Sequence, residues 1–265
     1  MVSANAAQFW EDGACVVRHA ITTTELAAAR AAVDSLTAAD ELADLSALVD
    51  SDETPRFKAG VDHWRTRDEF LRIATTGSIP AVVARILDTD RLWLYEDSVL
   101  VKEAGSTVPT RWHTDDGYFH VEGDQLATVW LALDPSPRAA GSLRFVRGSH
   151  RADTRYRPTL FVTDDPIPNT IGAPAPTLDL DDQSVFGWDL AAGDLTIHHA
   201  RTLHAAEGNS TPCARRALSI RYCGVATVVQ PKPGAPTKVG MSTVSPGTSM
   251  AVAAEAVGLP EAILT

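Results

Sequence analysis

The sequence has no long apolar run, no excess of basic residues and no pattern of paired cysteines. No apolar stretch approaches the roughly 20 residues that span a bilayer, and residues 1–10 carry neither the basic cluster nor the apolar core of a signal peptide. Acidic residues outnumber basic ones, 34 to 23, which gives a formal net charge of −11. Because an acidic surface repels phosphate groups, we expect neither nucleic acid nor a membrane as a partner.

Cysteine is scarce, and its spacing shows no motif. Cys15, Cys213 and Cys223 are odd in number and form no CxxC pair. Such usage is typical of a reducing compartment, where thiols serve as small apolar fillers, and it predicts a cytoplasmic location. The 265 residues are 45% hydrophobic and 22% charged, which is ordinary for a globular protein and excludes a disordered or collagen-like chain.

The first 90 residues are expected to be mostly helical. Thr22 and Glu25 have the spacing of a capping box, and an alanine-rich run over residues 26–36 follows with apolar side chains on one face. A second helical periodicity covers residues 79–87. A third, short helix is expected over residues 250–257, within a C-terminal tail of residues 229–265.

From residue 91 the pattern changes to short strands, which are expected over residues 92–102, 126–133, 143–146, 194–198 and 216–222. Many short strands behind a helical segment predict a mainly β fold with flanking helices, a sandwich or jelly roll over residues 91–228. Residues 157–186 are rich in proline and aspartate and have no period, so we expect a lid or a surface insertion there. The whole chain, residues 1–265, is expected to form a single domain.

Two histidines are followed two positions later by an acid: His113 by Asp115, and His120 by Glu122. On a strand, alternation turns both side chains of such a pair to one face. Two imidazoles and a carboxylate suit a divalent metal such as Fe(II) and leave coordination positions open. With 34 acids and eight histidines, however, about one such pair is expected by chance. Spacing alone therefore leaves a structural role open for either pair.

The surroundings of His113 are more specific than its spacing. The segment WHTD at residues 112–115 is followed by GYF at 117–119, WLALD at 130–134, GSLRFVRGSHR at 141–151, GD at 193–194, RTLH at 201–204 and RRALS at 215–219. In this succession, over about residues 57–222, the chain resembles the bacterial branch of the phytanoyl-CoA dioxygenase family of Fe(II)/2-oxoglutarate-dependent oxygenases. The resemblance implies a double-stranded β-helix, the cupin-like jelly roll.

The resemblance also implies roles for single residues. His113, Asp115 and His204 correspond to the iron ligands, and Arg215 corresponds to the arginine that binds the far carboxylate of 2-oxoglutarate. Arginine suits that carboxylate because its planar fork donates two hydrogen bonds and stays charged. Arg216 is the rival, since neighbours on a strand face opposite ways, and the family's spacing favours Arg215.

Several further residues are candidates with a structural alternative. Lys102 and Trp130 are candidate cosubstrate contacts, against a strand-edge role for Lys102 and a core role for Trp130. Asp97, on the same strand as Lys102, is a candidate contact with cosubstrate or substrate, and a solvated strand edge is equally open for it. Phe119, Asp116 and Tyr118 are candidate substrate contacts, and a core role for Phe119 is equally open. His198 and His199 are expected to pack in the barrel or to support the ligands, and His150 and His120 to have structural roles.

The implied activity is that of a non-haem dioxygenase. It would hydroxylate, or otherwise oxidise a C–H bond of, a small organic molecule while 2-oxoglutarate and O2 become succinate and CO2. The carboxylate of Asp115 favours hydroxylation over chlorination, because halogenating relatives carry a small residue at this position. Two other classes stay open at this point. One is a cupin-like hydrolase or isomerase with zinc or manganese in the same ligands, and the other is a non-catalytic binding module.

Overall fold

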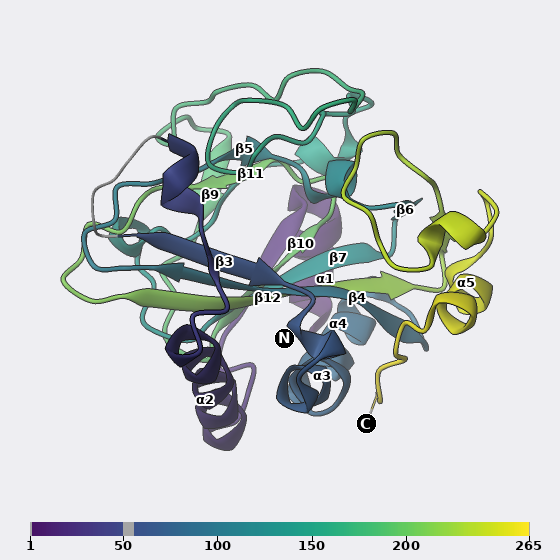
Figure 1. The fold of residues 1–265 in the computed structure, drawn as a ribbon, viewed down its shortest axis with the longest axis horizontal. Helices are drawn as coiled ribbons and strands as arrows, with labels where there is room; N and C mark the ends of the chain where they lie inside the picture. The colour runs from purple at the N-terminus through teal and green to yellow at the C-terminus, as the bar shows by residue number, and fades with distance from the viewer. Residues whose placement is uncertain (1, 50–55, 265) are drawn as a thin grey trace.

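Two antiparallel sheets face each other in the computed structural model, which describes residues 2–49 and 56–264 (Figure 1). Within these residues the larger sheet has seven strands, in the order β1-β10-β7-β12-β4-β3-β2, and the smaller has four, in the order β5-β11-β8-β9. A third, two-stranded ribbon joins β13 to β6. The predicted mainly β jelly roll, a double-stranded β-helix with flanking helices, is confirmed.

The larger sheet forms the floor of the interior. Its strands are β1 (Ala14–Val17), β10 (Leu195–His199), β7 (Leu126–Ala132), β12 (Arg215–Gly224), β4 (Leu92–Lys102), β3 (Phe57–Val61) and β2 (Ala43–Asp44). All residues of β7 and β10 are buried, because helices cover one face of this sheet and the smaller sheet covers the other. Burial on both faces explains why β7, LATVWLA, reads as an almost continuous apolar run in the sequence.

Helices pack beneath the larger sheet, on the face away from the smaller one (Figure 1). They are α1 (Val2–Asp12), α2 (Thr23–Ala38), α3 (Asp68–Thr75) and α4 (Ser78–Leu87), while α5 (Met250–Val257) lies beside the sheet near the C-terminus. The helices expected over residues 26–36, 79–87 and 250–257 all form. Among the described residues no single helix is long and apolar enough to cross a membrane. Only α3 and α4 taken together, a pair bent at the break between them, reach that length and apolar composition.

The first 90 residues also contain β1, β2 and β3, which the sequence patterns did not indicate. β1 pairs with β10, and β3 pairs with β4. These strands have two to five residues each. The partners β10 of β1 and β4 of β3 lie far along the chain. Strand preference depends on packing against such partners, so a short local pattern carries little signal of it.

The smaller sheet lies on the opposite side of the interior from the larger sheet, and the 157–186 loop covers its outer face. Its strands are β5 (Thr110–His113), β11 (His204–Ala206), β8 (Arg144–Val146) and β9 (Val185–Gly187), and the ribbon is β6 (Val121–Gly123) with β13 (Thr227–Val229). Leu178 and Leu180 of the loop pack on Trp112 and Leu203, and the Trp112 indole donates to the Leu178 carbonyl at 2.9 Å. This part of the loop therefore covers the outer face of the smaller sheet.

All three cysteines are free. Cys15 and Cys223 are buried, as expected of apolar fillers, but Cys213 is exposed. The filler interpretation is therefore wrong for Cys213, which lies in the turn that leads into β12.

The capping box of α2 also fastens the start of α4. The Thr22 hydroxyl accepts from the Glu25 amide at 3.2 Å, and the Glu25 carboxylate accepts from the Thr22 amide at 2.7 Å. The same carboxylate accepts from the amide and the hydroxyl of Ser78, at 2.7 and 2.9 Å. One carboxylate thus satisfies backbone amides at the first turns of two helices.

We expect Glu25→Ala to lower the free energy of unfolding by about 1–2 kcal/mol, because it removes hydrogen bonds at the starts of α2 and α4. Thr22→Ala removes one of these bonds and should cost about 1 kcal/mol or less. Urea unfolding at pH 7 measures both changes. A Glu25→Ala protein as stable as the wild type would contradict this account of the helix pair.

Candidate metal centre

His113 and His204 face each other across two neighbouring strands. β5 ends at His113 and β11 begins at His204, and the two residues are direct partners in this antiparallel pair. Their ring centroids lie 4.1 Å apart. Thr114 keeps an extended backbone, with φ −116° and ψ 145°, so Asp115 turns to the same side as His113 although it already begins the 3-10 turn η3 (Asp115–Tyr118). The side-chain alternation expected of H-x-D therefore holds.

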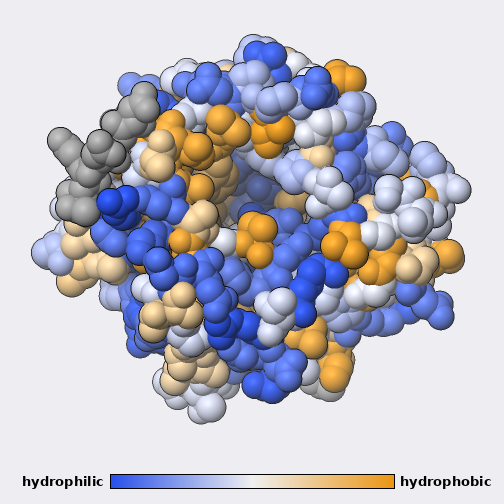
Figure 2. Space-filling model, in the orientation of Figure 1, coloured by the Kyte–Doolittle hydropathy of each residue, from blue (hydrophilic) through white to orange (hydrophobic). Residues whose placement is uncertain are grey.

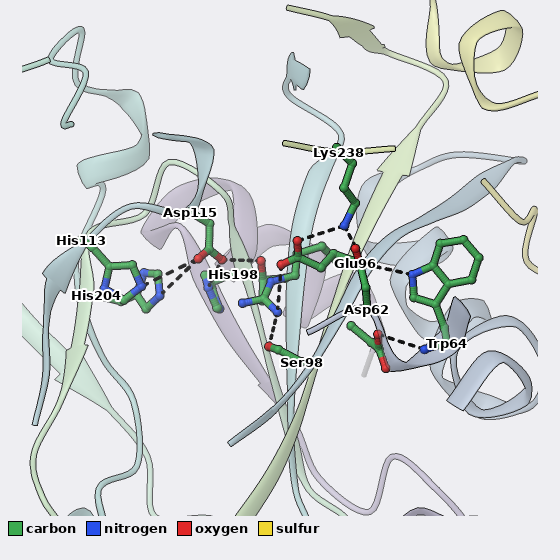
Figure 3. Close-up of polar contacts among 12 residues, drawn as sticks. Asp62, Trp64, Glu96, Ser98, His113, Asp115, His198, His204 and Lys238 are labelled. Carbon is green, nitrogen blue, oxygen red and sulfur yellow. Dashed lines mark hydrogen bonds and ion pairs between the residues drawn. The ribbon is translucent and has the colours of Figure 1, made fainter. Parts of the chain in front are cut away.

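The three side chains converge on one point of the interior (Figure 3). Asp115 Oδ1 lies 3.8 Å from His113 Nε2 and 3.9 Å from His204 Nε2. One ligand atom from each residue lies within 4.8 Å of the other two, and all three residues are buried. We call His113, Asp115 and His204 the triad.

Hydrogen bonds decide which nitrogen of each imidazole faces the centre. His113 Nδ1 lies 2.7 Å from the Arg111 carbonyl, and His204 Nδ1 lies 2.8 Å from the Thr202 carbonyl. A carbonyl only accepts, so each Nδ1 carries the proton and each Nε2 keeps its lone pair. Burial lowers the pKa of His113 to about 3 and that of His204 to about 4. Both rings are neutral at pH 7, the form that a metal takes as ligand.

Asp115 is held ionised and in a fixed orientation. Its Oδ2 accepts from the Thr128 hydroxyl at 2.5 Å and lies 3.3 Å from His198 Nε2. Burial by itself would raise the pKa of Asp115, but the His198 hydrogen bond and the Arg221 guanidinium contribute to holding it well below its ordinary value. Oδ1 is thereby left facing the two imidazoles. Two neutral imidazoles and one carboxylate fit a divalent first-row metal such as Fe(II) and leave positions open.

Arg215 faces this interior from the larger sheet, whereas Arg216 does not. Arg215 is buried, and its Nε and Nη1 donate to the carbonyls of Ala140 and Leu100 at 3.2 and 3.4 Å. Arg216 turns to the helix side of the sheet and pairs with Asp134 at 2.7 Å and Asp34 of α2 at 2.5 Å. Strand alternation thus separates the two arginines as expected, and only Arg215 faces the triad.

Lys102 and Asp97 lie on opposite faces of β4. Lys102 is the partner of Arg215 in the β4–β12 register, and its Nζ donates to the Glu207 carbonyl at 2.5 Å. Asp97 is buried on the helix side, where it accepts from the Trp64 amide at 3.3 Å. The interpretation of Asp97 as a site residue is therefore wrong, because an odd number of positions separates it from the inward-facing Lys102.

Two adjoining cavities lie between the sheets. A cavity of about 20 Å³ is bounded by the triad, Trp130 and Arg215, and one of about 390 Å³ extends from the triad toward β3 and the C-terminal tail. Figure 2 shows the molecule hollowed on this face, between β3 and β5 of Figure 1. Phe161 lines both cavities, and its ring centroid lies 5.0 Å from that of His113. The small cavity holds little more than a water molecule, so an organic acid enters only when lining side chains move apart.

Two of the three candidate substrate contacts reach the larger cavity. Phe119 and Tyr118 line it, and the Tyr118 hydroxyl also contacts the amide and the carbonyl of Thr159, both at 3.0 Å. Asp116 lines neither of these cavities. Its carboxylate turns to the other side of η3, 3.9 Å from the side chains of Arg155 and Lys232. The interpretation of Asp116 as a substrate contact is therefore not supported.

The remaining histidines lie outside the triad. His198, on β10, supports Asp115 and is not a third imidazole ligand. His199 Nδ1 accepts from the Arg201 amide at 3.0 Å, His150 contacts the Trp10 carbonyl at 3.2 Å, and His120 contacts the Pro236 carbonyl at 3.0 Å. These contacts agree with the structural roles expected of all three.

Three residues of the site were not singled out from the sequence. Thr128 and Phe161 carry no local signal, since Phe161 enters from an irregular loop with a positive φ of 70°. Arg221 could have been predicted as a site residue, because it stands an even number of positions after Arg215 on one strand and so shares its face.

A model of the phytanoyl-CoA dioxygenase family, PhyH, matches residues 9–217 of the chain. The chain belongs to this family. The family resemblance predicted from the sequence is therefore confirmed, while the bacterial branch within it stays a prediction.

Curated relatives agree with this assignment. Phytanoyl-CoA dioxygenase 1 of Oryza sativa subsp. japonica is 28% identical over 116 residues, which cover 44% of this chain and 38% of that protein. The matched region thus spans well under half of the rice relative. Ectoine dioxygenase of Stutzerimonas stutzeri is 24% identical over 234 residues, which cover 84% of this chain and 77% of that protein.

Solved structures share the fold over nearly the whole chain. The non-heme α-ketoglutarate-dependent carbocyclase SnoK from nogalamycin biosynthesis is 23% identical, with a TM-score of 0.73 and coverage of 98% of this chain and 96% of that one. The epimerase SnoN in complex with Fe3+, α-ketoglutarate and nogalamycin RO is 26% identical, with a TM-score of 0.71 and 94% coverage of each chain.

We expect His198→Leu and Thr128→Val each to weaken Co(II) or Fe(II) binding by about 10- to 100-fold, because Asp115 then loses a partner that orients it. This change is measured by titrating the protein with the metal under anaerobic conditions and recording the absorption spectrum of the bound ion. His199→Leu is the matched control, since His199 is equally buried but does not contact the triad. Unchanged affinity in both test variants would show that Asp115 needs neither partner.

Proposed function

We propose that the protein is a non-haem Fe(II)/2-oxoglutarate-dependent dioxygenase that oxidises a C–H bond of a small organic molecule. The observation that carries the proposal is the buried triad with Arg215 facing it from the opposite sheet. Membership of the phytanoyl-CoA dioxygenase family supports the same reaction class.

In this proposal His113 Nε2, Asp115 Oδ1 and His204 Nε2 hold the iron. When bound, the iron supplies O2 activation coupled to decarboxylation of 2-oxoglutarate to succinate and CO2. The chain presents both imidazoles already deprotonated at Nε2 and the carboxylate already ionised, so no ligand proton must leave at neutral pH. Thr128 and His198 prevent Asp115 from turning away, which keeps the three donors on one side of the ion.

Arg215 binds the far carboxylate of 2-oxoglutarate in this proposal. Burial lowers its pKa to about 10, so the guanidinium stays cationic at pH 7. Its present partners are two backbone carbonyls at 3.2 and 3.4 Å, long contacts that a charge-assisted carboxylate pair would outcompete. Trp130, whose ring centre lies 5.3 Å from the guanidinium, walls the same cavity. We assign Lys102 a supporting role, because its Nζ donates to the Glu207 carbonyl and its side chain does not line the small cavity.

The larger cavity is the proposed substrate site. Phe119, Tyr118 and Leu100 give it apolar walls next to the triad, and these walls exclude water from the reacting C–H bond. Asp115 occupies the ligand position that halogenases leave to chloride, which favours hydroxylation or a related C–H oxidation. Arg215 favours an oxygenase over a zinc or manganese hydrolase, because a hydrolase needs no anchor for an organic diacid.

Anaerobic addition of Fe(II) and 2-oxoglutarate is expected to produce a weak visible charge-transfer band in the wild type. Asp115→Ala and His204→Ala remove ligands and should abolish it, whereas His199→Ala should retain it. Absence of the band in the wild type, together with zinc that survives purification, would favour the hydrolase.

Arg215→Ala is expected to raise the dissociation constant for 2-oxoglutarate at least about tenfold, because the buried diacid loses a bidentate charged partner. Arg216→Ala is the matched control on the same strand and should leave that constant unchanged. Titration of the charge-transfer band measures both. The reverse result, with Arg216→Ala the damaging change, would reassign the anchor.

A further inference from the structure

A second arginine, Arg221, lies on the same face of β12 as Arg215 and lines both cavities. Positions 215 and 221 are about 20 Å apart along the strand. Both arginines line the small cavity that the triad bounds. Arg215 lies at the small cavity, and Arg221 reaches the boundary with the larger one.

Arg221 is buried and has a donor without a hydrogen-bond partner. It is 8% exposed, its Nη1 donates to the Ser98 hydroxyl, and it lies 3.7 Å from Glu96. Its Nε is buried and has no hydrogen-bond partner. A buried donor without a partner costs free energy. Nε itself is enclosed, but the side chain lines both cavities, so an arginine with an unpaired donor there is suited to a ligand acceptor.

Lys238, the other cation that lines the larger cavity, already has two carboxylate partners. Lys238 Nζ donates to Asp62 at 2.7 Å and to Glu96 at 3.0 Å, and the side chain is only 5% exposed (Figure 3). Among the described residues that line this cavity, Arg221 is therefore the cation with donors to spare. Its guanidinium carbon lies 6.0 Å from the Phe119 ring centre, so an apolar wall adjoins it.

The charges of this wall indicate which kind of acceptor fits. Three carboxylates line the cavity, those of Asp62, Glu96 and Asp115. Three cations lie at this wall: Lys238, Arg221 and Arg65, which lies 3.6 Å from Asp62. These groups therefore sum to no net charge. A substrate carboxylate would add a negative charge near Glu96 and Asp115 without a cation to balance it. A carbonyl or hydroxyl oxygen can accept from Arg221 without adding charge.

We propose that Arg221 binds the substrate, by donating to a neutral carbonyl or hydroxyl oxygen, and thereby positions an adjacent C–H bond at the triad. This assignment rests on the proposed function and names the substrate class: an uncharged, oxygenated molecule with an apolar body. The apolar body lies on Phe119, Tyr118 and Leu100, while the oxygen faces the wall of Ser98, Glu96 and Arg221.

The test uses three probes of similar shape: acetylcyclohexane, ethylcyclohexane and cyclohexanecarboxylate. Their binding to metal-free protein, in which no open metal position can take the carboxylate, is measured by ligand-detected NMR titration. The wild type is expected to bind the ketone at least about tenfold more tightly than the hydrocarbon and more tightly than the carboxylate. Arg221→Met should abolish the preference for the ketone over the hydrocarbon, whereas Arg216→Met, on the opposite face of the strand, should keep it.

Arg221→Lys retains the charge and the fold should Arg221→Met fail to fold, and it is expected to reduce the ketone preference several-fold. The same preference in Arg221→Met as in the wild type would overturn the proposal. Tightest binding of the carboxylate by the wild type would overturn the assignment to a neutral oxygen. Loss of 2-oxoglutarate affinity in Arg221→Met, read from the charge-transfer band, would instead make Arg221 a cosubstrate residue. Because probe binding is measured without 2-oxoglutarate, failure of the oxygenase proposal itself is seen separately, as a missing band in the wild type.

Discussion

The antiparallel register of β5 and β11 is the constraint on which the site depends. It makes His113 and His204 direct partners, and Asp115 follows on the same side because Thr114 stays extended. A slip of one residue in this pair would turn one imidazole to the outer face. The 157–186 loop opposes such a slip, because it buries the outward-facing Trp112 and Leu203 under apolar side chains.

Burial on both sides gives the interior its electrostatic character. The imidazoles stay neutral because water cannot solvate a charge there, and both Nε2 lone pairs remain free. The same burial opposes ionisation of Asp115, and the hydrogen bond from His198 and the charge of Arg221 contribute to overcoming this effect. This buried site thus contains one stabilised carboxylate and two neutral nitrogen donors, a combination suited to a divalent cation.

The two sheets divide the work of the site. The smaller sheet and the turn after β5 carry the triad. The larger sheet carries Thr128, His198 and the two inward-facing arginines, Arg215 and Arg221. Arg216 shows how the larger sheet is held in place, because it joins β12 to α2 through Asp134 and Asp34. Buried arginines with incomplete partners are costly to fold. Their retention on the inward face of β12 is understood if ligands complete their hydrogen bonds.

The order and spacing of residues along the chain determined much of the fold and of the site. The succession of short strands predicted a sandwich or jelly roll, and the capping box predicted α2. The succession of motifs around His113, Asp115, His204 and Arg215 predicted the family. These features depend on neighbours within a few residues, or on their order. Strand parity was readable too, since it separates Arg215 from Arg216.

The tertiary structure decided which distant groups meet. It placed His198 and Thr128 on Asp115, turned Asp116 and Asp97 away, brought Phe161 against His113, and recruited β1, β2 and β3 from a segment expected to be helical. These outcomes depend on sheet register and on loops that close over long sequence separations. No local periodicity encodes such contacts, because their free energy arises only when both partners are buried together.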